Sequence, residues 1–173
     1  MRVIAGELGG RKLASPDGTS TRPTTDRVRE AVFNALGSAG ILEEAVVADL
    51  FAGTGAVGIE AISRGAAHCT FVERDAAALR ALDENLATLD LDDRARVLRS
   101  DAMAAAGALD VDIAFVDPPY DFDAWDRLIG SIRAPFVVAE SGRPMDERDG
   151  WHVVRTKRYG RTWVTFLERE AAA

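Results

Sequence analysis

The central part of the chain alternates between short apolar runs and amphipathic stretches, and this rhythm constrains the fold more than any other feature. Apolar runs of strand length stand at 46–51, 69–72, 96–98, 113–116 and 136–139. Segments with helical periodicity lie between them, at about 57–64, 76–89, 102–108 and 123–132. Because a crossover between two parallel strands needs a helix to cover the sheet, the alternation predicts a doubly wound, mostly parallel α/β fold of Rossmann-like type.

Both ends of the chain depart from this rhythm. Strand-like segments at 152–155 and 162–167 are joined at 156–161 by a connection too short for a helical crossover, which predicts an antiparallel pair at the sheet edge. At the amino end, residues 2–14 place two extended segments around a glycine-rich stretch, as in a small hairpin, and a helix is expected at 26–36, ended by a glycine. We expect an N-terminal extension and one α/β domain, residues 1–24 and 25–173.

Composition is typical of a compact, reduced protein. With 47% hydrophobic and 28% charged side chains, the 173 residues suffice for one domain with a buried core. The single cysteine, Cys69, cannot form an internal disulfide, and His68 and His152 have no cysteine partners at the spacing of zinc ligands. No apolar run has the pattern of a signal peptide or the length of a membrane span. We therefore expect a cytoplasmic protein without a metal.

Charge is distributed unevenly along the chain, whose net charge is −7. Residues 1–29 carry six basic and three acidic groups, and residues 151–162 carry four basic groups and no acidic one. If the fold brings these basic ends together, they form a face for a polyanion such as nucleic acid. The alternative is that they are ordinary solvated side chains.

A glycine loop, residues 49–58, follows the first long apolar run. Its Gly53, Gly55 and Gly58 have the spacing G-x-G-x-x-G between a strand and a helix, the context in which that motif binds a ligand. Glu73, twenty residues beyond Gly53, ends the second strand, where a carboxylate can accept the hydroxyls of a ribose. The loop alone fits two cofactors equally well, NAD and S-adenosylmethionine.

The fourth apolar run ends in residues 117–120, which we call the Asp-Pro-Pro-Tyr segment. The exocyclic amine of a nucleobase is a poor nucleophile because its lone pair is delocalised into the ring. If the Asp117 carboxylate and the Pro118 carbonyl each accept one amine hydrogen, the lone pair can turn toward a sulfonium methyl group, and Tyr120 can stack on the flipped base. This chemistry favours S-adenosylmethionine over NAD and needs no metal.

Acidic residues at other strand ends complete the expected cofactor site, because ligands of open α/β sheets bind at the carboxyl edge of the strands. Asp101 with the backbone N–H of Ala102 suits the amine and a ring nitrogen of adenine. Asp49 can neutralise the ammonium group of a methionine moiety. Taken alone, Glu73 or Asp101 is equally well interpreted as a solvated strand end.

These motifs together resemble the class I, S-adenosylmethionine-dependent amino-methyltransferases. More narrowly, residues 1–13 and 22–34 resemble the bacterial 16S ribosomal RNA guanine-N2 methyltransferases, the RsmD family. The resemblance implies a seven-stranded sheet, a guanine N2 amine as methyl acceptor and a 16S ribosomal RNA presented within an assembling small ribosomal subunit. It also implies that the turn Arg22-Pro23-Thr24 closes over the methionine end of the cofactor.

The expected functional residues fall into three groups. The catalytic group is Asp117, Pro118 and Tyr120. The cofactor group is Asp49, Phe51, Gly53, Gly55, Glu73, Asp101, Ala102 and Thr24. The RNA-contacting group comes from the two basic ends and consists of Arg2, Arg11, Lys12, Arg22, Arg27, Arg155, Lys157, Arg158 and Arg161.

Other functions rank lower. A DNA adenine-N6 methyltransferase could use the same Asp-Pro-Pro-Tyr segment, but the residues before the first sheet strand leave little room for a DNA recognition domain. A non-catalytic nucleotide-binding RNA assembly factor, or an NAD-binding module, would have no evident need of that segment.

Overall fold

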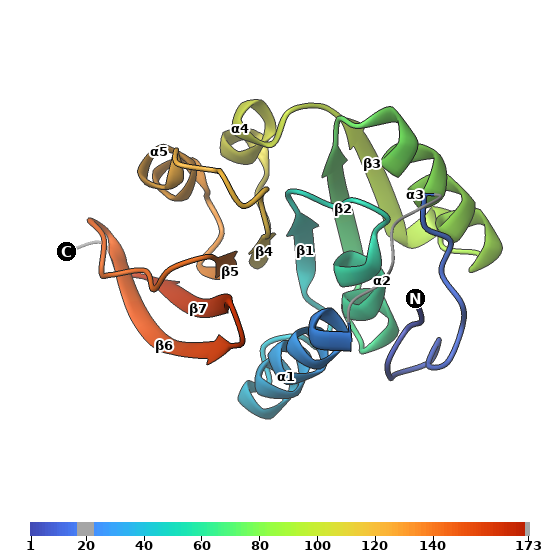
Figure 1. Cartoon of the computed structure of the whole chain (residues 1–173), viewed down its shortest axis with the longest axis horizontal. Coiled ribbons are helices and arrows are strands. Elements are labelled where there is room, and N and C mark those ends of the chain that lie inside the picture. The colour runs from blue at the N-terminus through green and yellow to red at the C-terminus, as the bar shows by residue number, and fades with distance from the viewer. Residues whose placement is uncertain (17–22, 172–173) are drawn as a thin grey trace.

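The computed structural model describes residues 1–16 and 23–171, and its framework is a seven-stranded sheet (Figure 1). The strands are β1 Val46–Asp49, β2 His68–Glu73, β3 Ala95–Arg99, β4 Ile113–Val116, β5 Phe136–Ser141, β6 Trp151–Tyr159 and β7 Thr162–Arg169. Their order across the sheet is β3-β2-β1-β4-β5-β7-β6. Strands β1 to β5 pair in parallel, and β7 pairs antiparallel with both β5 and β6. The predicted mostly parallel sheet with an antiparallel C-terminal pair is confirmed.

Helices cover both faces of the sheet, as a doubly wound fold requires. The helices of one face are α1 Pro23–Ala39, α2 Ala56–Ser63 and α3 Ala76–Thr88. Those of the other face are α4 Ala102–Ala105 and α5 Trp125–Ser131. Single 3-10 turns lie at Asp92–Arg94 and Ala106–Ala108. No helix within the described ranges has the length and apolar character needed to cross a membrane.

Most element boundaries shift by a few residues from the prediction, and two of these shifts have a plain physical reason. Helix α1 continues past Gly37 to Ala39, because Gly40, with φ 68°, is the residue that adopts the left-handed conformation ending the helix. Strand β6 extends to Tyr159, and β7 begins at Thr162. The connection is therefore a tight turn rather than the longer loop expected from the sequence.

The amino-terminal segment folds back on itself and packs against the helices of the first face. Arg2 and Lys12 form an antiparallel bridge. The buried carboxylate of Glu60 in α2 accepts the N–H groups of Ile4, at 2.7 Å, and Ala5, at 3.1 Å. The segment is thus anchored to α2 near the β3 edge of the sheet, whereas β6 forms the opposite edge (Figure 1).

Candidate active site

Five acidic residues converge on the carboxyl edge of the parallel strands. Because neighbouring parallel strands end at the same edge of a sheet, residues that close different strands become spatial neighbours. In chain order they are Asp49, Glu73, Asp101, Asp117 and Glu140. The sequence predicts the first four as site residues, and the structure adds the fifth.

The glycine loop needs its glycines for different reasons. A Cβ on Gly55, whose φ is 86°, would lie 2.4 Å from Leu82, and a Cβ on Gly58 would lie 2.3 Å from the Phe71 ring. These two glycines therefore allow α2 to pack closely on β2 and α3. A Cβ on Gly53, whose φ is 55°, would meet no described atom within 4 Å. Gly53 faces open space, which leaves its backbone accessible to a ligand.

Asp49 is an acid buried at the end of β1, with only 2% of its surface exposed. Its carboxylate accepts the N–H of Gly58 at 3.0 Å. Burial raises the pKa of Asp49 to about 7, the Gly58 N–H opposes this rise, and the negative charges of Asp117 and Glu73 add to it. A cationic ligand group would favour the ionised carboxylate, so the site fits the ammonium group of a methionine moiety.

The carboxylate of Glu73 organises the loops around the site. One oxygen accepts the N–H of Gly53 at 2.8 Å, and the other accepts the N–H groups of Arg74 and Asp75, each at 2.8 Å. Since a carboxylate has about four acceptor positions, about one is left for a ligand hydroxyl. Glu73 therefore has room for about one ribose hydroxyl, fewer than the sequence predicts, and it also holds the glycine loop in place.

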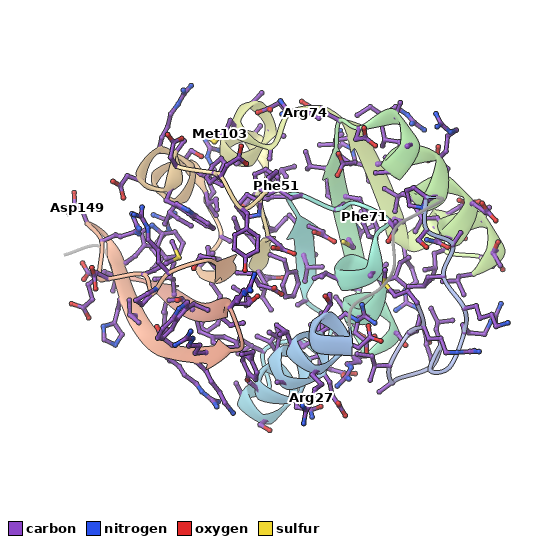
Figure 2. All side chains as sticks on the ribbon, in the orientation of Figure 1. Arg27, Phe51, Phe71, Arg74, Met103 and Asp149 are labelled. Atoms are coloured by element: carbon purple, nitrogen blue, oxygen red, sulfur yellow. The ribbon has the colours of Figure 1, made fainter. Side chains whose placement is uncertain are left out.

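Asp101 begins α4 and is held from two sides. One carboxylate oxygen accepts the N–H of Met103 at 2.8 Å, and the other pairs with the guanidinium of Arg74 at 2.8 Å. Arg74 is not among the residues predicted from the sequence. Phe51, Arg74 and Met103 lie around this edge of the sheet, and they come from three different segments (Figure 2).

Glu73, Arg74 and Asp101 line a cleft of about 750 Å³ that runs from Phe51 to the Asp-Pro-Pro-Tyr segment, and Ala102 is part of its wall. Asp49, Gly53 and Gly55 are not in this lining, and Asp49 instead lines a small cavity with Asp117 and Glu140. Phe51 packs edge-on against Phe122, with the ring centroids 5.7 Å apart. The cleft has the size of a small-molecule site and combines aromatic surface with a few acids. It fits an adenosine-containing cofactor.

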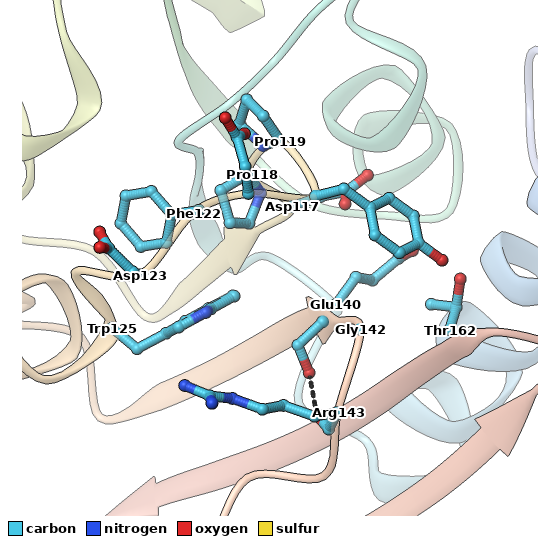
Figure 3. Close-up of a pocket in the computed structure, with 13 residues that line it drawn as sticks. Asp117, Pro118, Pro119, Phe122, Asp123, Trp125, Glu140, Gly142, Arg143 and Thr162 are labelled. Carbon is cyan, nitrogen blue, oxygen red and sulfur yellow. Dashed lines mark hydrogen bonds between the residues drawn. The ribbon is translucent and has the colours of Figure 1, made fainter.

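The Asp-Pro-Pro-Tyr segment separates this cleft from a second pocket of about 370 Å³, and residues 117–123 line both (Figure 3). Within the described residues, no N–H or O–H donates to the Pro118 carbonyl. Tyr120 is 73% exposed, and its ring lies 3.4 Å from where a Cβ on Gly142 would stand. An open carbonyl, an acid and an exposed ring are thus available to one planar ligand.

Asp117 has an acidic neighbour, Glu140, that is not among the residues predicted from the sequence. The residues preceding Asp117 and Glu140 pair across β4 and β5, which sets the two side by side. Desolvation raises the pKa of Asp117 to about 6. Burial and the charges of Asp117 and Asp49 raise the pKa of Glu140 to about 8, while the nearby guanidinium of Arg29 opposes that rise. Glu140 could have been found from the sequence, because it too follows an apolar run.

The structure brings only some of the predicted RNA-contacting residues together. Arg27 on α1 and Lys157 on β6 line one groove of about 640 Å³ beside the β6–β7 turn. Tyr159 shares this groove, and the Lys157 ammonium lies 5.2 Å from its ring centroid. Glu30 also lines the groove, so it combines two cations, one carboxylate and an aromatic ring, and the two cations with the ring suit a nucleic-acid backbone and base.

The other predicted contacts lie elsewhere or serve local structure. Arg2, Arg11 and Lys12 belong to the amino-terminal segment near the opposite sheet edge, where Arg11 donates to the carbonyl of Thr88 at 3.2 Å. Arg158 donates to the carbonyl of Gly160 at 2.8 Å and so supports the turn. Two exposed arginines complete the C-terminal set, Arg155 and Arg161.

Two predicted residues fall at the limit of the description. Arg22 lies outside the described residues. Thr24 belongs to α1, but its side chain is likewise outside the described part of the chain. The cofactor contact assigned to the turn Arg22-Pro23-Thr24 therefore stays a prediction.

The doubly wound sheet, with β7 inserted antiparallel between β5 and β6, is the class I methyltransferase fold. It is shared with magnesium protoporphyrin IX methyltransferase from Synechocystis, at a TM-score of 0.68 over 88% of this chain and 87% of that one; at 12% identity this likeness concerns the fold alone. The model of the family described as Conserved hypothetical protein 95 matches residues 1–168, and the chain belongs to that family. The resemblance to the RsmD family is thereby confirmed.

Relatives cover nearly the whole chain. Ribosomal RNA small subunit methyltransferase D of Escherichia coli K12 is 48% identical, over 99% of this chain and 91% of its own length. The protein of the same name from Haemophilus influenzae is 30% identical, over 92% of this chain and 89% of its own. The solved structure of Escherichia coli yhhF superposes with a TM-score of 0.87 at 38% identity, covering 99% of each chain.

Proposed function

We propose that this protein transfers the methyl group of S-adenosylmethionine to the exocyclic N2 amine of a guanine in 16S ribosomal RNA of the small ribosomal subunit. The names of relatives up to 48% identical support a small-subunit ribosomal RNA substrate. The single observation that carries the chemistry is the position of the Asp-Pro-Pro-Tyr segment between two pockets. A segment so placed can hold the acceptor base on one side and face the methyl donor on the other.

The cofactor would lie in the cleft, and its methionine end would extend beyond the cleft along the glycine loop toward Asp49, which lines a small adjoining cavity with Asp117. Asp49 would face its ammonium group, Glu73 a ribose hydroxyl, and Asp101 with the N–H of Ala102 its adenine. Phe51, Gly53, Gly55 and Thr24 would complete the contacts. When bound, S-adenosylmethionine supplies an electrophilic methyl group on a sulfonium sulfur.

The residues of the second pocket would prepare the acceptor. The Asp117 carboxylate and the Pro118 carbonyl would each accept one hydrogen of the amine, so that the nitrogen lone pair points toward the cleft. With a pKa of about 6, Asp117 is mostly ionised at neutral pH and can accept a hydrogen bond. Tyr120 would stack on the base, which fixes its plane. The rate gain would come from positioning and electrostatics.

We assign RNA contact to the groove of Arg27 and Lys157 first, because the structure brings these cations together beside an aromatic ring. The N-terminal extension, residues 1–24, would add contacts at the other sheet edge. The RNA would be presented within an assembling small subunit, and the enzyme would therefore work in the cytoplasm.

The test compares Asp117→Ala with the wild-type protein. The variant is expected to bind S-adenosylmethionine with unchanged affinity in calorimetry and to lose incorporation of labelled methyl into small ribosomal subunits. Asp110→Ala removes an exposed carboxylate outside both pockets and serves as the control. Nucleoside mass spectrometry of the product should find N2-methylguanosine. Full activity in Asp117→Ala would contradict the mechanism, and N6-methyladenine formed only in duplex DNA would contradict the substrate.

A further inference from the structure

Glu140 is an acid to which the proposed methyl transfer gives no role. It lies in β5, and the parallel register that pairs Val116 with Ala139 sets it next to Asp117. Phe115 and Val138, two positions earlier on the same strands, point into the core under α1, so Asp117 and Glu140 project from that same face of the sheet. Glu140 and Asp117 both line the second pocket (Figure 3).

The Glu140 carboxylate has no hydrogen-bonded or ion-paired partner in the described part of the protein, although the Arg29 guanidinium lines a cavity with it and opposes the rise of its pKa. Within the described ranges, no donor is hydrogen-bonded to it and no cation lies within ion-pair distance. Neither oxygen of this carboxylate is fully buried, so both remain open to the pocket. An acid at a strand end that neither caps a helix nor pairs with a cation is costly to the fold, as its raised pKa of about 8 reflects. Such a group is explained by a ligand that donates to it.

We propose that Glu140 reads the Watson–Crick edge of the flipped guanine by accepting its N1–H, and that this contact restricts the enzyme to guanine. The inference rests on the proposed function, since it takes the N2 amine to be held by Asp117 and Pro118. In guanine the N1–H is adjacent to that amine. The neighbouring carboxylate on β5 is therefore the group placed to meet it.

The chemistry discriminates between bases. Adenine carries a lone pair at N1, which a carboxylate repels, and it lacks an amine at C2. The analogue 2-aminopurine keeps the amine at C2 but lacks both the N1–H and the C6 oxygen of guanine, so the N1 contact is isolated only by comparing the two bases in the wild-type protein and in a variant of Glu140. A hydrogen bond to a charged group is worth roughly ten- to a hundredfold in discrimination. Because the pKa of Glu140 is about 8, most of this side chain is protonated at neutral pH before a base binds, and the N1–H of a bound guanine favours the ionised form that accepts it. A protonated carboxyl group can instead donate to an unprotonated N1, so the discrimination should strengthen as pH rises through 8.

The experiment uses small subunits reconstituted on RNA in which the mapped target guanine is kept or replaced, by splinted ligation, with 2-aminopurine. The ratio of kcat/KM for guanine to that for 2-aminopurine is measured for the wild-type protein and for Glu140→Gln. The amide of Gln keeps the size of the side chain and can donate to an unprotonated N1. We expect the ratio to fall by at least about tenfold in Glu140→Gln, mostly through slower reaction of guanine. Glu168→Gln, an exposed acid on β7, should leave the ratio unchanged.

The outcomes separate this inference from the proposed function. If the wild-type protein methylates the guanine-containing subunits but the ratio stays the same in Glu140→Gln, the reading of N1 by Glu140 is wrong and the proposed function stands. If the wild-type protein forms no N2-methylguanosine in those subunits, the proposed function fails and the inference with it. Cofactor affinity, measured by calorimetry, should be equal in both proteins and shows that the variant is folded. If Glu140→Gln does not fold, Glu140→Ala, which removes the acceptor, is measured instead, and an unchanged ratio there also overturns the inference.

Discussion

Replacing Asp49 with asparagine should stabilise the protein in the absence of ligand. The pKa of Asp49 rises from an ordinary value of 3.8 to about 7, chiefly because it is buried. The folded protein thus holds this proton more tightly than the unfolded chain does. As pH rises from about 4 to about 7, the unfolded chain ionises first, so the wild-type protein loses stability over that window.

The size of the effect follows from the same two values. At about 1.4 kcal/mol per pKa unit, the raised pKa of Asp49 lowers the free energy of unfolding by about 4 kcal/mol at pH 8, where the folded side chain is mostly ionised, and by about 2 kcal/mol at pH 5, where it is protonated while the unfolded chain is ionised. Asparagine carries no charge, and its side-chain oxygen can still accept the N–H of Gly58. The free energy of unfolding of Asp49→Asn should therefore exceed that of the wild type by more at pH 8 than at pH 5.

Urea unfolding of both proteins at the two pH values measures this difference. Calorimetry with S-adenosylmethionine on the same samples should show affinity lower by about ten- to a hundredfold in the variant, because the charge facing the ammonium group is gone. Equal stability of the two proteins at pH 8 would refute the explanation that burial raises the pKa of Asp49. Cofactor affinity equal to that of the wild type would refute the assigned contact.

Two further predictions concern the surroundings of the site. The Asn85 side chain donates to the carbonyls of Ala14, at 3.1 Å, and Thr54, at 2.9 Å, so Asn85→Ala should lower the free energy of unfolding by about 2 kcal/mol and weaken cofactor binding through the glycine loop. Urea unfolding and calorimetry check this, and unchanged values in both would contradict it. Replacing Arg27 and Lys157 with alanine should lower the slope of log binding constant against log salt concentration by the amount expected for about two phosphate contacts. The affinity for the cofactor should not change. An unchanged salt slope would place both residues outside the RNA interface.

The fold and most of the cleft are predictable because each parallel strand is a short apolar run ended by a polar residue. Asp49, Glu73 and Asp117 are identifiable in this way, since the parallel rhythm alone places their strand ends at one edge. Glu140 obeys the same rule, but its position beside Asp117 depends on the register of β4 and β5, which one sequence does not specify. The mixed direction of the last strands also follows from the short connection between them.

Long-range polar contacts could not be predicted. Arg74 pairs with Asp101, 27 positions away, and Asn85 reaches Thr54 across 31 positions. Both contacts depend on how the helices pack on the sheet, and the periodicity of the sequence does not predict that packing. The basic ends illustrate the same limit, because their charge is plain in the sequence, whereas only the topology brings Arg27 beside Lys157 and leaves Arg2, Arg11 and Lys12 near the opposite sheet edge.

The position of β7 affects how the sheet is completed during synthesis. Although β7 is the last strand in chain order, it lies between β5 and β6 rather than at a margin. Until the residues of β7 have left the ribosomal exit tunnel, β5 has an unpaired edge and β6 has no strand with which to pair. A premature stop or a proteolytic cut before Thr162 would therefore remove an interior strand, release β6 and open the wall that carries Glu140.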